Sequence, residues 1–384
     1  NKEYGHARQE ENHIVYGYAR DYKGREWSIS TLLDLREIPW QEFKLIVAHN
    51  AKFEFQWLQR AGVDTHRLLP FCTQIAEYVI GGNRTGSKLW PVSLDSSCKR
   101  RGLPSKEGIA GRLIRSGVCP STIPLWLVRK YCRRDVRVTE RLFRTQVKVI
   151  RELGLEKVLM LRLLFCPVVA DLEMRGMFLD AKIVKEQDDA LAAEELSLVK
   201  EMEAMAGDIN LRSWQQKSWF MYGDPDGLKM PHPQDKYGNS VLMSATAEFP
   251  EGAPSTNKNA VQYLATLKLN KRQRRWLELQ TRFQKVTKLR SSYTKKFLQA
   301  VKENECVLFG GLNQTVTKTH RLSSSPNLQN IARILKRCFS TRLPGWKIAN
   351  ADYAQLEFRT AGVLAQDRQV LEDIRNEADV HSFT

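Results

Sequence analysis

The sequence predicts a multidomain protein in which an α/β domain is followed by a mainly helical region. Its 384 residues, 42% of them hydrophobic, are enough for more than one core, because a domain usually holds about 100 to 200 residues. Strand-like runs alternate with helical ones near the N-terminus, and helical spacing dominates after Trp126. We therefore expect two or three domains.

The α/β assignment rests on the first 62 residues. The runs HIVYGYARD and KLIVAHN are rich in β-branched and aromatic residues, whereas FEFQWLQRAG has apolar residues at helical spacing. This alternation is typical of a sheet with flanking helices.

Helical spacing from Trp126 to Leu164 predicts that the first domain ends with helices near residue 145. A second region then begins. Prolines and glycines cluster between Tyr222 and Ser255, which excludes a long regular element there and predicts loops with a hairpin.

The chain is strongly basic. It has 60 Lys and Arg against 43 Asp and Glu, a formal net charge of +17, which indicates a polyanionic partner, and nucleic acid is the first candidate. We predict no membrane association, because no stretch approaches the roughly 18 apolar residues of a membrane span and no basic amphipathic anchor is present. The seven cysteines form no CxxC pair, which is typical of the reducing cytoplasm.

The basic charge is concentrated between Lys258 and Lys302. This segment holds thirteen Lys or Arg and a single acidic residue, Glu278, a net charge of +12. Apolar residues recur three or four apart from Leu279 to Val301, which predicts a helical arm with an apolar stripe and basic flanks. A basic run is often only a solvated face, but a solvated helix usually carries both signs, so the sign count favours contact with phosphates.

The segment NADYAQLEFRTAG, residues 350–362, carries two carboxylates five residues apart. Residues 346–351 are short and β-compatible, and helical spacing follows from Leu356. Asp352 is therefore expected at a strand-to-helix junction, where a carboxylate and a neighbouring carbonyl can bind Mg²⁺.

The second carboxylate, Glu357, has three interpretations from its position alone. It is a second metal ligand, a shape filter, or the ion-pair partner of Arg359 or Arg321. Taken by itself, DYxxxE is most often a carboxylate at a helix N-terminus with a surface glutamate, so the surrounding sequence has to decide.

Upstream lies KTHRLSSSPNLQNIAR, residues 318–333, whose hydroxyls, amides and arginines can contact phosphates, sugars and base edges. This segment and DYAQLEFR together resemble family A DNA polymerases, the DNA polymerase I-like group with its phage members. The family motifs are T-x-R-L-S-S…P-N-L-Q-N and D-Y-S-Q-I-E-x-R. The two motifs at this separation are highly specific, and the compact N-terminal segment favours a phage-type member.

The resemblance covers nearly the whole chain. NLRSWQQKSWFMYG resembles the N-x-x-S-x-x-Q segment of the family, PSTNKNAVQYLA its P-S-T helix start and KLRSSYTKKFL its long thumb helix. VAHNAKFEFQWL and YCRRD resemble the second and third motifs of its 3′→5′ proofreading exonuclease. The resemblance implies a ribonuclease H-like α/β exonuclease domain over 1–145, linker helices and thumb over 146–312 with the basic arm at 258–302, and the start of an α+β palm over 313–384.

Two positions depart from the family pattern. The second exonuclease motif ends in Asp in the family but in Glu54 here, and a metal ligand displaced by about 1 Å can cost roughly 100-fold in rate. The family glycine before the arginine of the palm motif is His320 here, an exchange of the most permissive backbone residue. We assign His320 no catalytic role.

The resemblance implies specific roles for individual residues. In the polymerase site, Asp352 and the carbonyl of Tyr353 would bind Mg²⁺, two ions per active site, and Glu357 would exclude ribonucleotides by crowding the sugar 2′ position. In the exonuclease site, Glu54 and Asp135 would bind metal, Tyr131 would assist catalysis and Asn50 would contact the substrate. The implied DNA-binding residues are Arg321, Ser323, Ser324, Asn327, Gln329, Asn330, Arg359, Lys268, Lys271, Arg272, Arg274, Arg275, Lys288 and Arg290.

The implied function is template-directed DNA synthesis with 3′→5′ proofreading, with primer-template DNA and dNTPs as partners. The first exonuclease motif, D-x-E, and the later H-D-E and R-x-x-x-K-x-x-x-x-x-x-Y-G motifs are not in these residues. We therefore expect a fragment that holds DNA but catalyses poorly alone, from a bacterial or phage-infected cytoplasm. A DNA-binding half of a split polymerase, or an exonuclease only, are the alternatives, and a processivity factor or missing polymerase half is a further expected partner.

Overall fold

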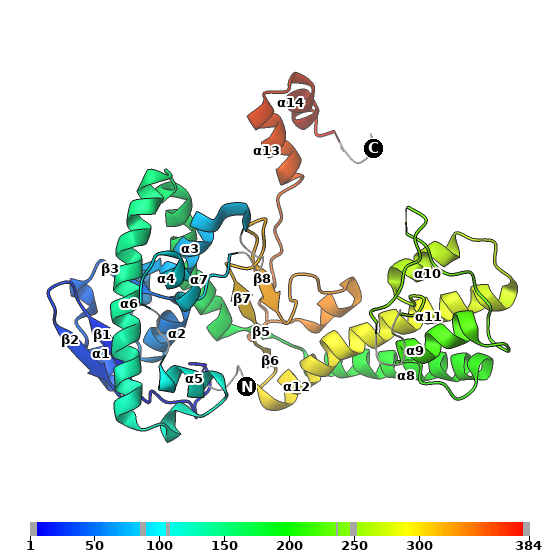
Figure 1. Ribbon diagram of the computed structural model, residues 1–384, viewed down its shortest axis with the longest axis horizontal. Helices are drawn as coiled ribbons and strands as arrows, with labels where there is room; N and C mark the ends of the chain where they lie inside the picture. The colour runs from blue at the N-terminus through cyan, green and yellow to red at the C-terminus, as the bar shows by residue number, and fades with distance from the viewer. Residues whose placement is uncertain (1–5, 85–89, 105–107, 236, 246–251, 379–384) are drawn as a thin grey trace. The chain divides into compact units, whose positions relative to one another are not determined.

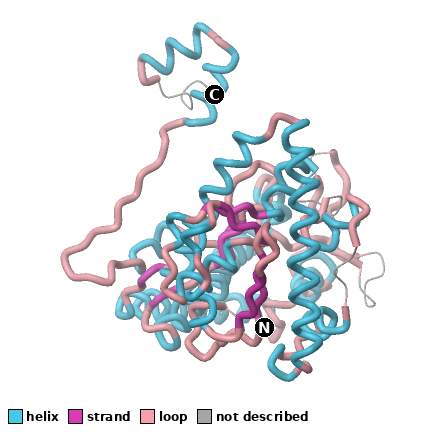
Figure 2. Tube along the Cα trace, turned by 90° about the vertical axis from the view of Figure 1, so that its left-hand side faces the viewer, coloured by secondary structure: helices cyan, strands magenta, loops and turns pink. Residues whose placement is uncertain are grey.

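The computed structural model describes residues 6–84, 90–104, 108–235, 237–245 and 252–378. The chain divides into two compact units, residues 1–339 and 340–384. Most of the regular structure is helical, with short strands (Figures 1 and 2). Among the described residues, no helix is both long enough and apolar enough to cross a bilayer.

The N-terminal part of the larger unit alternates short strands and helices, as predicted. Its strands pair as β1 with β2, antiparallel, and β3 with β4, parallel. The described strands thus form two separate two-stranded sheets, and a ribonuclease H-like sheet stays a prediction. The elements are β1 (Gly17–Arg20), β2 (Glu26–Ile29), α1 (Leu32–Glu37), η1 (Trp40–Glu42), β3 (Leu45–Ala48), α2 (Lys52–Arg60), η2 (Thr65–Arg67), β4 (Leu69–Cys72), α3 (Thr73–Gly81), η3 (Gly82–Arg84), α4 (Leu94–Arg100), α5 (Ile109–Arg115) and η4 (Pro120–Thr122).

Two long helices follow, α6 (Leu125–Glu152) and α7 (Glu156–Arg175). They are joined by a turn at Gly154, which has the left-handed φ of +65° that glycine adopts at little cost. The boundary predicted near residue 145 lies inside α6, because the buried face of this helix continues to Ile150. A break at 145 would cut a regular helix.

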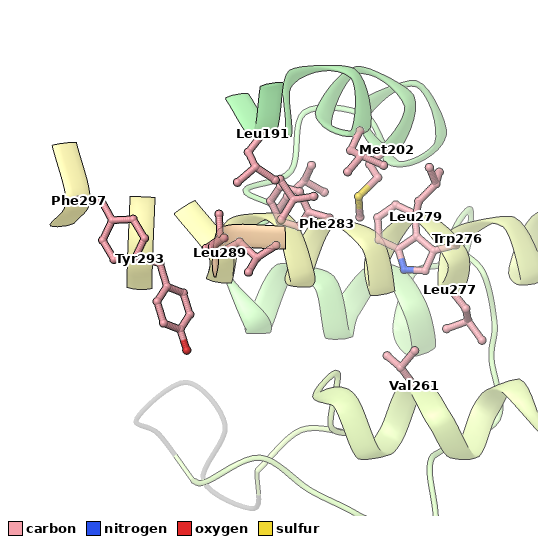
Figure 3. Packing of buried hydrophobic residues seen from close by; sticks show 14 of the residues in the cluster. Leu191, Met202, Val261, Trp276, Leu277, Leu279, Phe283, Leu289, Tyr293 and Phe297 are labelled. Atoms are coloured by element: carbon pink, nitrogen blue, oxygen red, sulfur yellow. The ribbon is translucent and has the colours of Figure 1, made fainter. Parts of the chain in front are cut away.

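The helical region is built around α8 (Ala181–Ala206) and α11 (Lys271–Leu289), which pack along each other (Figure 3). The predicted apolar stripe is confirmed. Its residues Leu279, Phe283, Leu289 and Phe297 are buried in one core with Leu191 and Met202 of α8. The remaining elements are α9 (Trp214–Ser218), a π-helical turn (Trp219–Gly223), α10 (Lys258–Ala265), a second π-helical turn (Arg290–Thr294) and α12 (Lys295–Glu303).

The basic arm is not one continuous helix. The chain leaves helical geometry after Ala265, and α11 starts afresh with Asn270 as N-cap in a capping box with Gln273, a strong start signal. From Lys271 to Glu303 the helix continues through the second π-helical turn. In the described part of 222–255, two isolated antiparallel bridges, Gln234 with Ser240 and Leu242 with Pro254, agree with the predicted loops and hairpin.

Short strands complete the larger unit. Strand β5 (Met177–Phe178) pairs with β6 (Val307–Leu308), and β7 (Gly311–Asn313) pairs with β8 (Ser323–Ser325), both antiparallel. The 3₁₀ helix η7 (Arg333–Cys338) follows.

The smaller unit contains α13 (Leu356–Ala365) and α14 (Arg368–Arg375). The predicted helix from Leu356 is confirmed, but the strand expected at 346–351 is wrong, since these residues form an irregular loop. A strand needs a neighbour to satisfy its backbone groups, and the described residues of this unit supply none. Asp352 therefore lies in a loop before a helix and not at a strand-to-helix junction.

Candidate functional site

The first candidate carboxylate, Asp352, is exposed in the loop before α13. Its Oδ1 accepts a hydrogen bond from the backbone N–H of Tyr353 at 2.9 Å. The Tyr353 ring is 79% exposed. This carboxylate is held close to its own backbone but stays accessible, as a ligand for a hard cation must be.

Glu357 lies in the first turn of α13, where a carboxylate interacts favourably with the helix dipole. Its side chain is exposed, whereas Arg359 is half-buried with an Nε that has no hydrogen-bond partner. The helix is entered through Gln355, whose φ of +50° is left-handed, and this sharp turn separates Glu357 from the loop that carries Asp352.

The Asp352 carboxylate and the Tyr353 carbonyl are suitable ligands for Mg²⁺, but they form only part of a metal site. A carboxylate oxygen and a backbone carbonyl are ligands that Mg²⁺ accepts. Among the described residues, no group of three or more His, Cys, Asp or Glu side chains could hold a metal ion. A two-metal centre would need at least one further carboxylate beside Asp352.

The predicted DNA-contacting residues of 318–333 are brought together on β8 and the turn after it. The register pairs Leu312 of β7 with Ser324 of β8. Two of the polar side chains stabilise the turn itself: Ser324 Oγ accepts from Leu328 N at 2.9 Å, and Asn327 Oδ1 accepts from Asn330 N at 3.2 Å. The side chains of Arg321, Gln329 and Asn330 are exposed on the same segment, and Ser323 is half-buried.

The loop between β7 and β8 is anchored on the α/β part of the larger unit. Arg162 of α7 donates to the carbonyl of His320 at 2.7 Å and to the carbonyl of Gln314 at 3.3 Å. Tyr78 of α3 donates to the carbonyl of Thr317, and its ring lies 4.6 Å from the His320 ring. We call Tyr78, Arg162 and His320 the loop anchor.

A second link joins strand β7 to the same part of the unit. Glu173 of α7, only 3% exposed, accepts from Lys52 Nζ and from Gln56 Nε2, each at 2.6 Å. It also accepts from the backbone N–H of Leu312, and Lys52 Nζ donates to the Leu312 carbonyl at 2.7 Å. A buried carboxylate with this many donors is well satisfied and rigidifies its surroundings.

Several arginines of the basic arm are engaged within the fold. Arg290 donates to Glu195 at 2.6 Å and to Asp188 at 3.3 Å, and Arg275 pairs with Glu201 at 2.6 Å. These acidic residues lie on α8. The basic residues of the arm are therefore partly neutralised by acidic residues of another helix. Counting the charges of one sequence segment could not show this.

This pairing limits what some arginines of the arm offer to a ligand. Arg290 is half-buried between two carboxylates, and its phosphate contact stays a prediction. Arg272 donates to the backbone carbonyls of Met205 and Asp226, and Arg275 is held by Glu201. Arg272 and Arg275 are nevertheless exposed, as are Lys268, Lys271, Arg274 and Lys288.

The candidate exonuclease residues come from α2 and α6. Asn50 has a φ of +68° at the turn into α2, and Glu54 in the first turn has a buried Oε2 without a hydrogen-bond partner. Burial raises the pKa of Glu54 to about 8, so it is mostly protonated at neutral pH. Tyr131 of α6 packs closely against Gly111 of α5, at a site where an added Cβ would lie 2.9 Å from its ring.

Asp135 lies one turn after Tyr131 on α6 and is half-buried. It belongs to no group of three or more ligating side chains in the described residues, and neither does Glu54. The metal-binding roles of both residues stay predictions.

Sequence reasoning missed the loop anchor and Glu173. Tyr78 and Arg162 are single residues on two helices, far in sequence from the loop that they hold, so no motif marked them. Glu173 carried one weak signal, since an acidic residue in an otherwise apolar stretch of α7 has to find a buried partner.

Comparisons with known proteins agree with the resemblance. The model of DNA polymerase family A matches residues 181–384. DNA polymerase I of Borreliella burgdorferi is 27% identical over 353 residues, covering 88% of this chain and 35% of the relative. DNA polymerase I of Pseudomonas aeruginosa is 28% identical over 354 residues, covering 89% of this chain and 36% of the relative. The chain thus spans about a third of these relatives.

A solved structure has a similar fold. It is described as the POL domain of Pol1 from M. smegmatis in complex with DNA primer-template and dNTP. The TM-score is 0.69 at 20% sequence identity, over 95% of this chain and 59% of that chain. At this identity the likeness speaks for the fold alone.

Proposed function

The chain belongs to DNA polymerase family A, and we propose that it takes part in template-directed DNA synthesis. The proposal is made for the protein of which these residues form part, since the chain spans about a third of its curated relatives. The primer 3′-oxygen forms a bond to the α-phosphorus of a dNTP, and the bond to pyrophosphate breaks. The observation that carries the proposal is the exposed Asp352 carboxylate five residues before Glu357, in the region that matches the family.

Asp352 and the carbonyl of Tyr353 are proposed to hold Mg²⁺. When bound, two such ions stabilise the charge on the entering and leaving oxygens of the phosphoryl transfer. The part of this chain is to hold the carboxylate at a fixed place in an accessible loop. The exposed position of Asp352 and its hydrogen bond to the Tyr353 backbone support this role.

Glu357 is proposed as the residue that excludes ribonucleotides. Its exposed side chain in the first turn of α13 is available to crowd the 2′ position of an incoming sugar. Replacing Glu357 with Ala is expected to raise ribonucleotide incorporation by about 10- to 100-fold, the range of selectivity that loss of a steric contact gives.

Primer-template DNA is proposed to lie against the segment 321–330 and the exposed lysines of the basic arm. The minor groove presents similar acceptors on every base pair, so Arg321, Gln329 and Asn330 can test its shape without reading sequence. The lysines would contact phosphates, and DNA affinity should then fall steeply as salt rises. We place this activity in the cytoplasm of a bacterial or phage-infected cell.

The test is primer extension with Mg²⁺ by the protein with its complete polymerase domain. Asp352→Asn should lower the rate by about 100-fold or more, because the lost charge stabilisation is worth several kcal/mol. Glu372→Gln, an exposed change on α14 in the same unit, is the matched control and should leave the rate unchanged. Full activity in Asp352→Asn would refute the assigned role.

A second candidate is a DNA-binding role without catalysis for these residues, as one half of a split polymerase. It is supported by the exposed Lys268, Lys271, Arg274 and Lys288 of the basic arm, which can contact phosphates without a metal ion. For residues 1–145 we propose an exonuclease-related domain with weak or no trimming activity, because Glu54 is one methylene longer than the family aspartate and its Oε2 is buried without a hydrogen-bond partner. Magnesium-dependent removal of 3′ nucleotides that increases in Glu54→Asp would support a working nuclease site.

A further inference from the structure

One face of α6 carries a line of basic side chains that the proposed function does not use. Successive residues of this line are three or four positions apart in the sequence, and all are exposed. An exposed tryptophan, Trp126 at 64% exposure, begins the line. We call this line the α6 stripe: Trp126, Lys130, Arg134, Arg137, Arg141, Arg144 and Lys148.

The stripe lies on the helix face opposite to the core. Val138, Leu142, Gln146 and Ile150 of α6 are buried, and they follow the same three- and four-residue spacing on the other side of the helix. The buried face packs on β1, β3 and helices α3, α4 and α5. Figure 1 shows α6 as one long continuous helix, so the stripe is straight.

Two basic residues beside the stripe are used in packing. Arg129 and Arg133 lie over the rings of Tyr16 and Tyr18 at 5.6 and 5.3 Å, so their guanidinium groups are used in packing on β1 and the residue before it. Within the stripe, Arg144 pairs with Glu140 at 2.8 Å. The stripe itself contains no acidic residue.

Such a line of like charges destabilises a helix whose exposed face contacts only water. Like charges three or four residues apart destabilise a helix by about 0.2–0.5 kcal/mol per pair, and the stripe contains five such neighbouring pairs. A solvated helix would ordinarily place acidic residues between them. Glu140 offsets part of this repulsion through Arg144, and a bound polyanion would remove the rest.

We propose that the α6 stripe binds single-stranded DNA, with its phosphates along the basic residues and a base stacked on Trp126. The stripe extends for about 33 Å at 1.5 Å per residue, room for about eight to ten nucleotides at 3.4 Å each. An exposed aromatic ring next to a basic track is the pattern of single-strand binding, because only an unpaired base offers its face for stacking. Paired bases in a duplex are already stacked on each other.

This site is independent of the proposed polymerase function. The stripe lies within residues 126–148, outside the range 181–384 that matches the family. It uses neither Asp352 nor the basic arm. Loss of binding here and loss of nucleotide incorporation can therefore be observed separately.

The first experiment measures the affinity of the chain for a fluorescent oligothymidylate of about 12 nucleotides over a range of salt. The triple variant Arg137→Ala, Arg141→Ala and Lys148→Ala should bind at least about tenfold more weakly. Its slope of log affinity against log salt should be less steep by about 2, at about 0.7 per lost phosphate contact on a single strand. Alanine favours helix, so the variant should keep the circular dichroism of the parent.

The matched control removes three exposed basic residues away from the stripe, Arg36, Arg67 and Lys157, by replacing each with Ala. Its affinity should stay within about twofold and its slope should be unchanged. If the two triple variants lose affinity equally, the effect is one of net charge and the proposal is overturned. A duplex of equal length, tested in parallel, should lose less affinity than the single strand, and a larger loss for the duplex would overturn the single-strand assignment.

The second experiment tests stacking directly. Trp126→Ala should weaken single-strand binding by about tenfold, within the range for loss of one stacked base, without changing the salt slope. An oligonucleotide with 5-iodouracil should photocrosslink to Trp126 in the parent chain. Crosslinks found only at other residues, together with unchanged affinity of Trp126→Ala, would overturn the role of this residue.

Discussion

At the scale of single residues, His320 shows how a departure from a family pattern is accommodated. The resemblance places a glycine at this position, and the backbone has the left-handed φ of +62° that glycine favours. A non-glycine residue there costs roughly 1–2 kcal/mol. The contact of the His320 ring with Tyr78 and the hydrogen bond from Arg162 to its carbonyl offset this cost. The imidazole therefore has a packing role.

Glu54 is the second residue whose environment changes its interpretation. The sequence indicated only that the side chain is one methylene longer than the family aspartate. The structure adds burial of Oε2 without a partner, which raises the pKa to about 8. Ionisation of this carboxyl is therefore opposed by the folded state.

This burial predicts a dependence of stability on pH. Because the folded pKa lies above the unfolded value near 4.5, the unfolded state binds fewer protons between these values, and stability falls as pH rises from about 4.5 to about 8. Glu54→Gln should remove this loss and increase the free energy of unfolding at pH 8 by about 1–3 kcal/mol. Denaturant unfolding at pH 5 and pH 8 measures the free energy of unfolding of each variant, and the exposed Glu37→Gln is the control. Equal pH dependence in the parent and Glu54→Gln would contradict the burial.

At the scale of elements, the basic arm is stabilised by the acidic face of α8. Burial acts to raise the pKa of Asp188, but hydrogen bonds from Arg290 and Thr294 outweigh it and hold this pKa below its ordinary value. The same pairing with Arg290 lowers the pKa of Glu195 against the effect of burial. An ion-pair network thus joins α8 to α11 and the turn after it, and the sequence of either helix alone does not predict it.

Removing one member of this network should loosen α8 from α11. Asp188→Asn is expected to cost about 2–3 kcal/mol, somewhat less than a fully buried pair because Arg290 is partly exposed. In the parent chain the stabilisation from Asp188 is present above its unfolded pKa and is lost as pH falls below about 4. Asp189→Asn, an exposed neighbour on α8, is the control. Thermal melting at pH 7 and pH 3.5 should separate the two variants, and identical curves would count against the network.

The loop anchor predicts coupling between α7 and the segment 321–330, which is proposed to contact DNA. Arg162→Ala removes hydrogen bonds to the carbonyls of His320 and Gln314 and should destabilise the loop by about 2 kcal/mol. The affinity for primer-template DNA should decrease while the maximal rate of incorporation stays unchanged. Arg175→Ala, on the same helix with an exposed partner, should have neither effect. A lower maximal rate with unchanged affinity would contradict the anchor.

At the scale of the whole molecule, the sequence predicted the helices better than the contacts between segments that are distant in the chain. Helix α2, the apolar stripe of α11 and α12, and the helix after Asp352 follow from local periodicity and are confirmed. The strand at 346–351 was wrong because strands depend on partners elsewhere in the chain. The position of Arg290 could not be predicted because its carboxylate partners lie about a hundred residues away. Contacts between distant segments leave no periodic signal.

Only the parts of the candidate site that lie in sequence motifs could be predicted. The segment 321–330 and the Asp352 loop were found from residue patterns, and the family match supports both. The loop anchor and the α6 stripe were not found. The stripe lies within a segment recognised as helical and, at 131–135, as an exonuclease motif. Its seven members form a line only once the buried face of α6 is known.

We propose that segment 321–330 binds the primer-template and that Asp352 serves the chemical step. Single-turnover nucleotide incorporation by the protein with its complete polymerase domain, measured against primer-template concentration, separates the two roles. Gln329→Ala should raise the DNA concentration at half-maximal rate and keep the maximal rate. Asp352→Asn should lower the maximal rate by about 100-fold and keep the half-maximal concentration. A maximal rate that survives in Asp352→Asn would contradict the claim.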